Sequence, residues 1–434
     1  MTSILIAIIV FSVLVLFHEF GHFIVAKAVG IGVIEFSLGM GPRILSFGKG
    51  ETRYSWKAIP FGGSCAMVGE DEDSDAPNAF GSKPAWARFL VVIAGPAFNI
   101  LLAFIMSLFL TGFGGVNTSV VHSVTAGSAA EQAGIEAWKD SVTAINSKRI
   151  VMGRELLVYT NLHPLDGSDV TVELERNGNK RTVVINPKVS GYRIGISYMA
   201  TDEPARLTQV TEGGPAEKAG LRTGDVITSI NGTAIGNGSD MRRYLEEHPI
   251  DGTTMTLGIE RSSERLTIDM TPEAYEAFDL GFAATYVYEE WDGNIWKLIR
   301  YSAREVRYWL SYTFMSIRML VSGKVGVRDL SGPVGIVSTI GTVVESGMES
   351  GGTGAAALNV LTMLVLLSVN LGVMNLLPIP ALDGGRILFI LYEIIFRKPV
   401  PQKAEGVIHL IGFVLLMGLM VVVLFSDILK LFGR

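Results

Sequence analysis

The chain contains 434 residues, of which 49% are hydrophobic and only 18% are charged, and its mean hydropathy is +0.39. A composition this apolar excludes an ordinary soluble protein, and the length allows several domains. The net charge of −6 gives no reason to expect nucleic acid as a partner, and the single cysteine, Cys65, excludes an intrachain disulfide.

An apolar stretch over residues 4–29 contains the sequence His-Glu-Phe-Gly-His, which begins at His18. On a helix, His18 and His22 lie on one face, where both imidazoles can bind one metal ion. Glu19 lies between them in angle and can take a proton from water activated by that metal. A lone histidine on an apolar face is usually a satisfied core residue, but this register favours a catalytic metal. Because titratable groups at bilayer depth are usually functional, we expect a membrane-embedded metalloprotease.

Three further segments, residues 89–113, 356–377 and 407–425, are long enough to cross a hydrocarbon core about 30 Å thick. No basic residue precedes Lys27, so the first stretch lacks the basic region of a signal peptide and is expected to be a retained span. The loops after the first and third spans are rich in Lys and Arg, which predicts that both face the cytoplasm. Residues 114 to about 350 would then lie outside, as would both termini.

Between the second and third spans, short β-type runs alternate with turns, and two stretches look like copies of one unit. The clearer copy spans residues 214–232 and includes Gly224-Asp225 and Asn231-Gly232, whereas the fainter copy spans residues 127–146. Both resemble PDZ domains of the bacterial protease type. Such domains add an extended peptide to a sheet edge, and residues 192–196 and 279–282 are the candidate carboxylate loops. The alternative, that the units bind no tail and act as a steric filter, stays open.

Residues 291–328 combine basic and aromatic side chains, and Arg300, Arg304 and Arg307 recur at helical spacing. This pattern predicts a helix that lies on the membrane surface. A partial insertion over residues 307–320 is the alternative, but Arg307 and Arg318 argue against a full span.

A catalytic zinc site normally has three protein ligands and one open position, so a third ligand is needed. The carboxylate best placed at a membrane edge is Asp383, which follows the third span and precedes two glycines. Pro378 and Pro380 should open the end of that helix, and opened backbone at membrane depth is tolerated where it lines a cavity. On its own Asp383 is also typical of a cap or turn residue, but together with the histidine motif it favours a ligand.

In these motifs the chain resembles the site-2 protease family of intramembrane zinc metalloproteases, and within it the bacterial regulator of sigma-E protease group. The resemblance covers nearly the whole length. It implies that His18, His22 and Asp383 hold Zn²⁺ and that Glu19 is the general base. It also implies that the substrate segment is held by the polar and proline residues of the Asn-x-x-Pro-x-Pro-x-x-Asp-Gly motif, namely Asn375, Pro378 and Pro380. Residues 34–67 would supply a membrane-associated β-hairpin, and residues 94–99 and 331–335 look like further family motifs.

The expected fold is therefore a multi-pass α-helical membrane protein of about four transmembrane helices, with a membrane-associated β-hairpin and two inserted β-rich PDZ domains. The expected segments are an N-terminal membrane half (1–113), a first PDZ domain (114–200), a second PDZ domain (201–288), an amphipathic membrane-surface segment (289–350) and a C-terminal membrane half (351–434).

The expected function is hydrolysis of a peptide bond within the transmembrane segment of single-span membrane proteins that another protease has already trimmed. By resemblance, the substrates are of the anti-sigma factor type, in regulated intramembrane proteolysis during stress, and remnant signal peptides are a second class. The protein would lie in the bacterial inner membrane, with periplasmic PDZ domains and an active site toward the cytoplasm. The alternative is a catalytically inactive scaffold or receptor that binds peptides through its PDZ domains; a metal transporter is a weaker rival.

Overall fold

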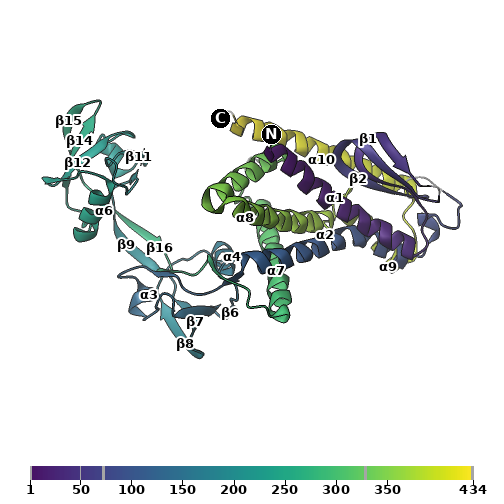
Figure 1. Ribbon diagram of the computed structural model, residues 1–434, viewed down its shortest axis with the longest axis horizontal. Coiled ribbons are helices and arrows are strands. Elements are labelled where there is room, and N and C mark those ends of the chain that lie inside the picture. Colours follow the sequence, from purple (N-terminus) through teal and green to yellow (C-terminus); the bar gives the residue numbers. More distant parts are fainter. Residues whose placement is uncertain (1, 49, 71–73, 327–329, 432–434) are drawn as a thin grey trace. The chain divides into compact units, whose positions relative to one another are not determined.

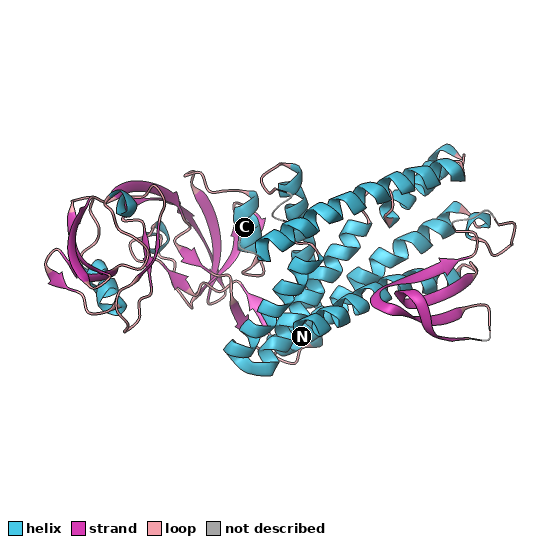
Figure 2. Cartoon of the chain, turned by 90° about the horizontal axis from the view of Figure 1, so that it is seen from above, coloured by secondary structure: helices cyan, strands magenta, loops and turns pink. Residues whose placement is uncertain are grey.

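The computed structural model describes residues 2–48, 50–70, 74–326 and 330–431 (Figure 1). The chain divides into two compact units. The helical unit comprises residues 1–118, 157–162 and 286–434, and the β-rich unit comprises residues 119–156 and 163–285. Strands dominate the β-rich unit, whereas the long helices belong to the helical unit (Figure 2).

Among the described residues, four helices are long and apolar enough to cross a membrane: α1 (Thr2–Ala28), α2 (Ala85–Gly114), α8 (Pro333–Asn375) and α10 (Gln402–Leu431). The expectation of four apolar helices is therefore confirmed by length and composition. Helices α1 and α2 run side by side (Figure 1). Their backbones approach closely at Gly21, where an added Cβ would collide with the carbonyl oxygen of Ala94. A small residue at this position therefore holds the helix of the histidine motif against α2.

Helix α8 is a helical hairpin rather than a single straight span. Its backbone leaves the helical conformation at Gly351 and at Gly352, where φ is +69°. The two limbs fold against each other, since the side chain of Asn359 donates to the carbonyl of Val343 at 3.1 Å. The second limb, from residue 353 to Asn375, leads toward the Pro378 and Pro380 segment.

The expected β-hairpin is present between the first two spans. It consists of β1 (Val33–Phe47) and β2 (Arg53–Met67), which pair antiparallel. Its base packs on the end of α1 through Val33, Met67 and Ala26. Inside the hairpin, a hydrogen bond from Arg43 lowers the pKa of Glu35 to about 2 despite burial of this carboxyl. A short 3₁₀ helix, η1 (Phe80–Ser82), follows the hairpin.

The helical unit also contains α7 (Ile295–Val321) and α9 (Asp383–Phe396). Helix α7 crosses α2 (Figure 1) and packs against α2 and α8 through Val306, Trp309 and Leu310. The Ser302 hydroxyl donates to the carbonyl of Ser107 at 3.1 Å. Residues 327–329, at the end of the basic aromatic stretch, lie outside the described residues. Helix α9 occupies part of the segment that the sequence suggested was a loop.

The β-rich unit contains two four-stranded sheets with the same strand order. In the first sheet the order is β6-β5-β7-β8, and in the second it is β13-β12-β14-β15. The strands of the first sheet are β5 (Asp140–Ile145), β6 (Lys148–Arg149), β7 (Val170–Arg176) and β8 (Asn179–Ile185). Those of the second are β12 (Val226–Ile230), β13 (Thr233–Ala234), β14 (Met255–Arg261) and β15 (Glu264–Met270). The repetition read in the sequence is thus present as a repeated sheet topology.

The second repeat lies within the chain of the first. Strand β9 (Lys188–Arg193) pairs with β16 (Glu273–Phe278), and β4 (Ser123–Val124) pairs with β17 (Phe282–Ala283). The other strands and helices between α2 and α7 are β3 (Val116–Thr118), α3 (Ala129–Gln132), α4 (Glu155–Leu162), β10 (Ile196–Tyr198), β11 (Leu207–Val210), α5 (Pro215–Lys218), α6 (Gly238–Glu247) and β18 (Val287–Glu289). Strands that follow the second repeat therefore pair with strands that precede it, in two separate two-stranded sheets.

Equivalent polar contacts hold the two repeats. Asp140 accepts hydrogen bonds from Arg176 at 2.7 Å, and Asp225 accepts the same pair of bonds from Arg261. Both aspartates are buried, with 0% and 2% of their surface exposed. Burial is the largest single influence and raises the pKa of each aspartate. The arginine hydrogen bonds, a backbone hydrogen bond and the attraction to nearby arginines together outweigh it and hold each pKa below its ordinary value. We call these two contacts the Asp–Arg clamps.

Candidate metal centre

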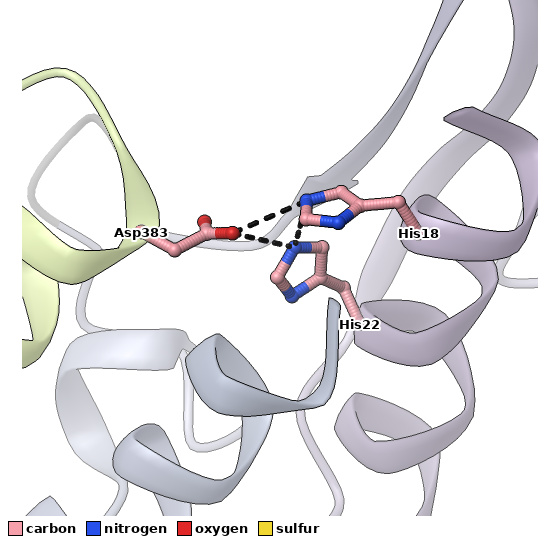
Figure 3. A group of neighbouring side chains, drawn as sticks. All are labelled: His18, His22 and Asp383. Atoms are coloured by element: carbon pink, nitrogen blue, oxygen red, sulfur yellow. Dashed lines mark hydrogen bonds and ion pairs between the residues drawn. The ribbon is translucent and has the colours of Figure 1, made fainter. Parts of the chain in front are cut away.

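The helical unit brings together three residues that the sequence predicted as ligands, His18, His22 and Asp383 (Figure 3). Asp383 Oδ2 lies 3.1 Å from His18 Nε2 and 3.7 Å from His22 Nε2, and the two Nε2 atoms lie 3.2 Å apart. One ligand atom from each residue lies within 4.8 Å of the others. The two histidines are buried, and the aspartate is partly buried.

Two helices far apart in the sequence supply these side chains. His18 and His22 are one turn apart on α1, so both rings project from one face. Asp383 is the first residue of α9 and follows the non-helical segment that begins after Asn375. Within that segment Ala381 has a φ of +79°, an uncommon value for a residue with a side chain. The proline-containing segment thus turns the chain so that α9 begins at the histidines.

The second nitrogen of His22 is held by the backbone of α2. His22 Nδ1 lies 2.8 Å from the carbonyl oxygen of Val91. A carbonyl oxygen can only accept, so Nδ1 carries the proton and donates. The lone pair of Nε2 then faces Asp383, as a metal-binding imidazole requires.

His18 has a different second contact, the side-chain amide of Asn99 on α2. This amide is fully buried and its Nδ2 lies 3.0 Å from His18 Nδ1, while Oδ1 has no hydrogen-bond partner among the described residues. In a structure, the oxygen and nitrogen of a side-chain amide are assigned from the hydrogen bonds that they make. With the amide rotated by 180°, Oδ1 accepts from His18 Nδ1, and the lone pair of His18 Nε2 faces Asp383. We therefore assign Asn99 the acceptor orientation in the metal-bound protein.

Space for the two imidazoles depends on Gly95, also on α2. A Cβ at this position would collide with His22 Nε2 and lie 2.8 Å from His18 Cε1. Helix α2 can therefore pass directly behind the rings only because residue 95 has no side chain. The neighbouring Gly384 has a similar function at the start of α9, where a Cβ would collide with the carbonyl oxygen of Leu377.

The cluster opens into a cavity of about 430 Å³ whose lining includes His18, His22, Asp383 and the half-buried Glu19. Its polar end is formed by Glu70, Arg386 and His409. Arg386 forms an ion pair with Glu70. A second cavity of about 310 Å³ is lined by the same three residues and by Arg88, Glu393 and Glu405. The two cavities thus share charged lining residues.

The donor set fits zinc. Two neutral imidazoles and one carboxylate make a three-ligand set of the kind found in catalytic zinc sites, which keep one position for water or substrate. Asp383 Oδ2 is buried and has no hydrogen-bond partner among the described residues, although it faces both histidines. Buried polar atoms are normally satisfied, so this oxygen is placed for a partner such as a cation.

The remaining predicted residues lie close to the cluster but make different contacts. Asn375 Nδ2 lies 3.4 Å from His18 Nε2, so this amide borders the site. Pro380 packs against α10, where a Cβ on Gly412 would collide with its carbonyl oxygen, and Pro378 is exposed. A role of these three residues in substrate binding stays a prediction.

Sequence reasoning assigned no role to Asn99, Gly95 and His409. A signal existed for each, since Asn99 and Gly95 lie in an apolar span within a noted motif, and His409 is one of only 6 histidines in the chain. The sequence does not show on which face of α2 or α10 each of these residues lies.

The apolar helices and the histidine–carboxylate cluster define a zinc metalloprotease with its site in a membrane-type helical unit. Consistent with this, the model of Peptidase family M50 matches residues 6–419, and the chain belongs to that family, the site-2 proteases. The expected family, metalloprotease activity and zinc cofactor are confirmed.

Similar curated proteins come from bacteria. Zinc metalloprotease RasP of Oceanobacillus iheyensis is 30% identical, with 100% of each chain covered. Zinc metalloprotease RasP of Bacillus licheniformis is also 30% identical over 100% of each chain. RasP of Geobacillus kaustophilus is 29% identical over 99% of this chain and 98% of that relative. Together with the four apolar helices, these relatives support a protein of the bacterial inner membrane.

Among solved structures, the HtrA3 PDZ domain bound to a phage-derived ligand aligns with 21% of this chain and 92% of that domain. The sequence identity is 17% and the TM-score is 0.18, a value too low to support a conclusion about the fold.

Proposed function

We propose that this metalloprotease cleaves peptide bonds inside the transmembrane segments of single-span membrane proteins. The observation that supports this most directly is the position of the cluster. His18 and His22 lie within an apolar helix long enough to span a bilayer. His18 is ten residues before the helix end at Ala28, which corresponds to about 15 Å of helix. A scissile bond that reaches this cluster must come from a segment at bilayer depth.

In this proposal His18 and His22 would hold zinc through Nε2, and Asp383 would hold it through its carboxylate. When bound, the ion makes water a stronger nucleophile and polarises the scissile carbonyl. Glu19, on the same helix and in the same cavity, accepts the proton of the attacking water and delivers it to the leaving amine. Val91 and Asn99 hold the outer nitrogens of the two histidines, which fixes the ring orientations.

A helical substrate shields its own carbonyls, so it must unwind before cleavage. We propose that the released backbone groups pair with an edge of the β1–β2 hairpin and that Asn375, Pro378 and Pro380 hold the segment beside the cluster. The closeness of the Asn375 amide to His18 supports this placement.

The proposed topology has four spans with both termini outside. The basic loops face the cytoplasm, and the charged lining formed by Glu70 and Arg386 gives water a path to the site from that side. The β-rich unit would lie in the periplasm as two PDZ domains, with the segment over 289–350 at the membrane surface. These domains would bind peptide tails or exclude untrimmed substrates by size, so that substrates of the anti-sigma factor type enter only after a first cut.

The deciding experiment is cleavage of a single-span model substrate with a short external tail, in membranes. We expect product with the wild type, none with Glu19→Gln, and none after addition of a zinc chelator. Zinc content is measured in parallel, because Glu19→Gln should keep the metal while losing turnover.

A second substrate with a long folded external tail tests the size filter, which predicts that this substrate is excluded. Cleavage of the short-tailed substrate by Glu19→Gln at the wild-type rate would contradict the assigned base. Cleavage restricted to peptide bonds outside the membrane segment would contradict the proposed substrate class.

A further inference from the structure

Helix α10 contacts the chain segment that presents Asp383. The backbone N–H of Ala381 donates a hydrogen bond to Nδ1 of His409, with a distance of 2.8 Å between the two nitrogens. Nδ1 is therefore an acceptor, and the proton of the neutral ring is on Nε2. That nitrogen lies 3.8 Å from the carboxylate of Glu405, one turn earlier on α10. The carboxylate favours this tautomer of His409.

The donor of this bond, Ala381, has an unusual backbone conformation. Its φ of +79° lies in the left-handed region, which is unfavourable for a residue with a Cβ. Such a conformation persists only where surrounding contacts impose it. Asp383 lies two residues further along, so the direction in which its carboxylate points depends on this turn.

Two further contacts hold His409 and the turn together. Gly412, one turn later on α10, is so close to Pro380 that a Cβ there would collide with the proline carbonyl oxygen. The ring of Phe389 on α9 packs edge-on against the His409 ring, with 5.6 Å between the ring centres. The turn is thus enclosed between α9 and α10, and His409 provides its directional hydrogen bond.

We propose that His409 is a positioning residue for the metal centre. It imposes the left-handed turn at Ala381 and thereby holds Asp383 against His18 and His22. The inference rests on the proposed function, in which Asp383 is a zinc ligand. It adds that α10, which contributes no ligand, controls how tightly the metal is kept.

The test measures zinc retention in the full chain purified in detergent. His409→Leu keeps the size of the side chain and removes the acceptor, whereas His409→Asn places an oxygen near the position of Nδ1. We expect His409→Leu to lose zinc to a chelator at least about tenfold faster than the wild type, and His409→Asn to recover most of the difference. Val414→Leu, at an exposed site on the same helix, is the matched control and should behave as the wild type.

A cobalt-substituted sample adds a readout of ligand geometry. The visible absorption should change in His409→Leu and return toward the wild-type spectrum in His409→Asn. Gly412→Ala, which pushes α10 away from Pro380, should accelerate zinc loss by an independent route and keeps the inference testable if His409→Leu does not fold.

The outcomes separate this inference from the proposed function. If Asp383→Asn loses zinc while His409→Leu and Gly412→Ala retain it as the wild type does, the positioning role is wrong and the site assignment stands. If His409→Asn is as defective as His409→Leu, the hydrogen bond is not the cause and the inference is also overturned. Zinc retention by Asp383→Asn would contradict the ligand assignment itself.

Discussion

Each unit of the molecule contains an aspartate with a buried carboxylate oxygen, but the surroundings of these oxygens differ in kind. In the β-rich unit, Asp140 and Asp225 each receive two hydrogen bonds from an arginine and one from a backbone N–H. In the helical unit, Asp383 turns a buried oxygen toward two imidazoles, and this oxygen has no hydrogen bond among the described residues. A carboxylate whose oxygens are satisfied by the protein stabilises the fold, whereas one left unsatisfied is prepared for a partner from outside.

This difference separates structural from functional acids without reference to burial, since the clamp aspartates are the more deeply buried. It also predicts that the two kinds of site respond to different perturbations. Chelators should act on the helical unit, and replacement of a clamp aspartate by asparagine should act on the β-rich unit.

The largest expected effect on zinc binding or stability comes from replacing the aspartate of each site by asparagine. Asp383→Asn should weaken zinc binding by more than about 100-fold, because loss of a ligand should exceed the 10–100-fold cost of losing an outer partner. Zinc per chain, measured by metal analysis after dialysis, checks this.

The same replacement at a clamp, Asp225→Asn, should keep zinc at the wild-type level. It should lower the local stability around β14 by about 2 kcal/mol, since charge-assisted hydrogen bonds to Arg261 are lost. Hydrogen exchange of β14 peptides measures this stability. Loss of zinc from Asp225→Asn would contradict the separation of the two sites.

A smaller effect is expected at the outer partner of His18. Asn99→Leu should weaken zinc binding about 10–100-fold, because His18 loses the group that fixes its tautomer. Asn99→Asp offers only acceptors and should bind zinc nearly as well as the wild type. If the aspartate variant were as weak as the leucine variant, Asn99 would be a donor and the acceptor orientation would be wrong.

The clamps should also give the β-rich unit a characteristic pH dependence. Because the pKa of each clamp aspartate is lower in the folded protein than the ordinary 3.8, its stabilisation is present above that pH. The contribution is lost as the pH falls through the lowered pKa. Hydrogen exchange of β7 and β14 at decreasing pH, corrected for the intrinsic exchange rate, should show this loss. The Asp140→Asn, Asp225→Asn double variant should show a shallower dependence, and an unchanged slope would be evidence against the clamps.

The smallest expected effect concerns a turn between strands of the first repeat. Ser147 has a φ of +64° where the second repeat has Gly232 with a φ of +83°. Ser147→Gly should therefore raise the local stability of β5 and β6 by roughly 0.5–1 kcal/mol, and Gly232→Ser should lower that of β12 and β13 by a similar amount. Hydrogen exchange of the two turns tests both changes, which should leave zinc binding unaltered.

Local sequence patterns were sufficient for the parts of the fold with strong periodicity. The four apolar helices, the hairpin after α1 and the repeated β units all have signals within short windows. The closeness of His18 and Asp383 was also predicted, because a catalytic zinc site needs three ligands and neither motif provides all three.

Other features depend on contacts between distant segments and could not be read from one sequence. The pairing of β4 with β17 joins strands that lie before and after the whole second repeat in the sequence. The role of Asn99 depends on which face of α2 meets α1, and an almost uniformly apolar helix does not show this. His409 was missed for the same reason on α10.

The cluster joins two side chains from α1 to one from α9, and these helices are separated by most of the length of the chain. A ribosome makes α1 long before α9, so a nascent chain has both histidines inserted but no carboxylate to complete the set. With Asp383 as the third ligand, the metal site is therefore incomplete until α9 has been made, late in synthesis. A product of truncated translation or of degradation that lacks α9 would likewise lack this carboxylate, although its histidine motif is intact.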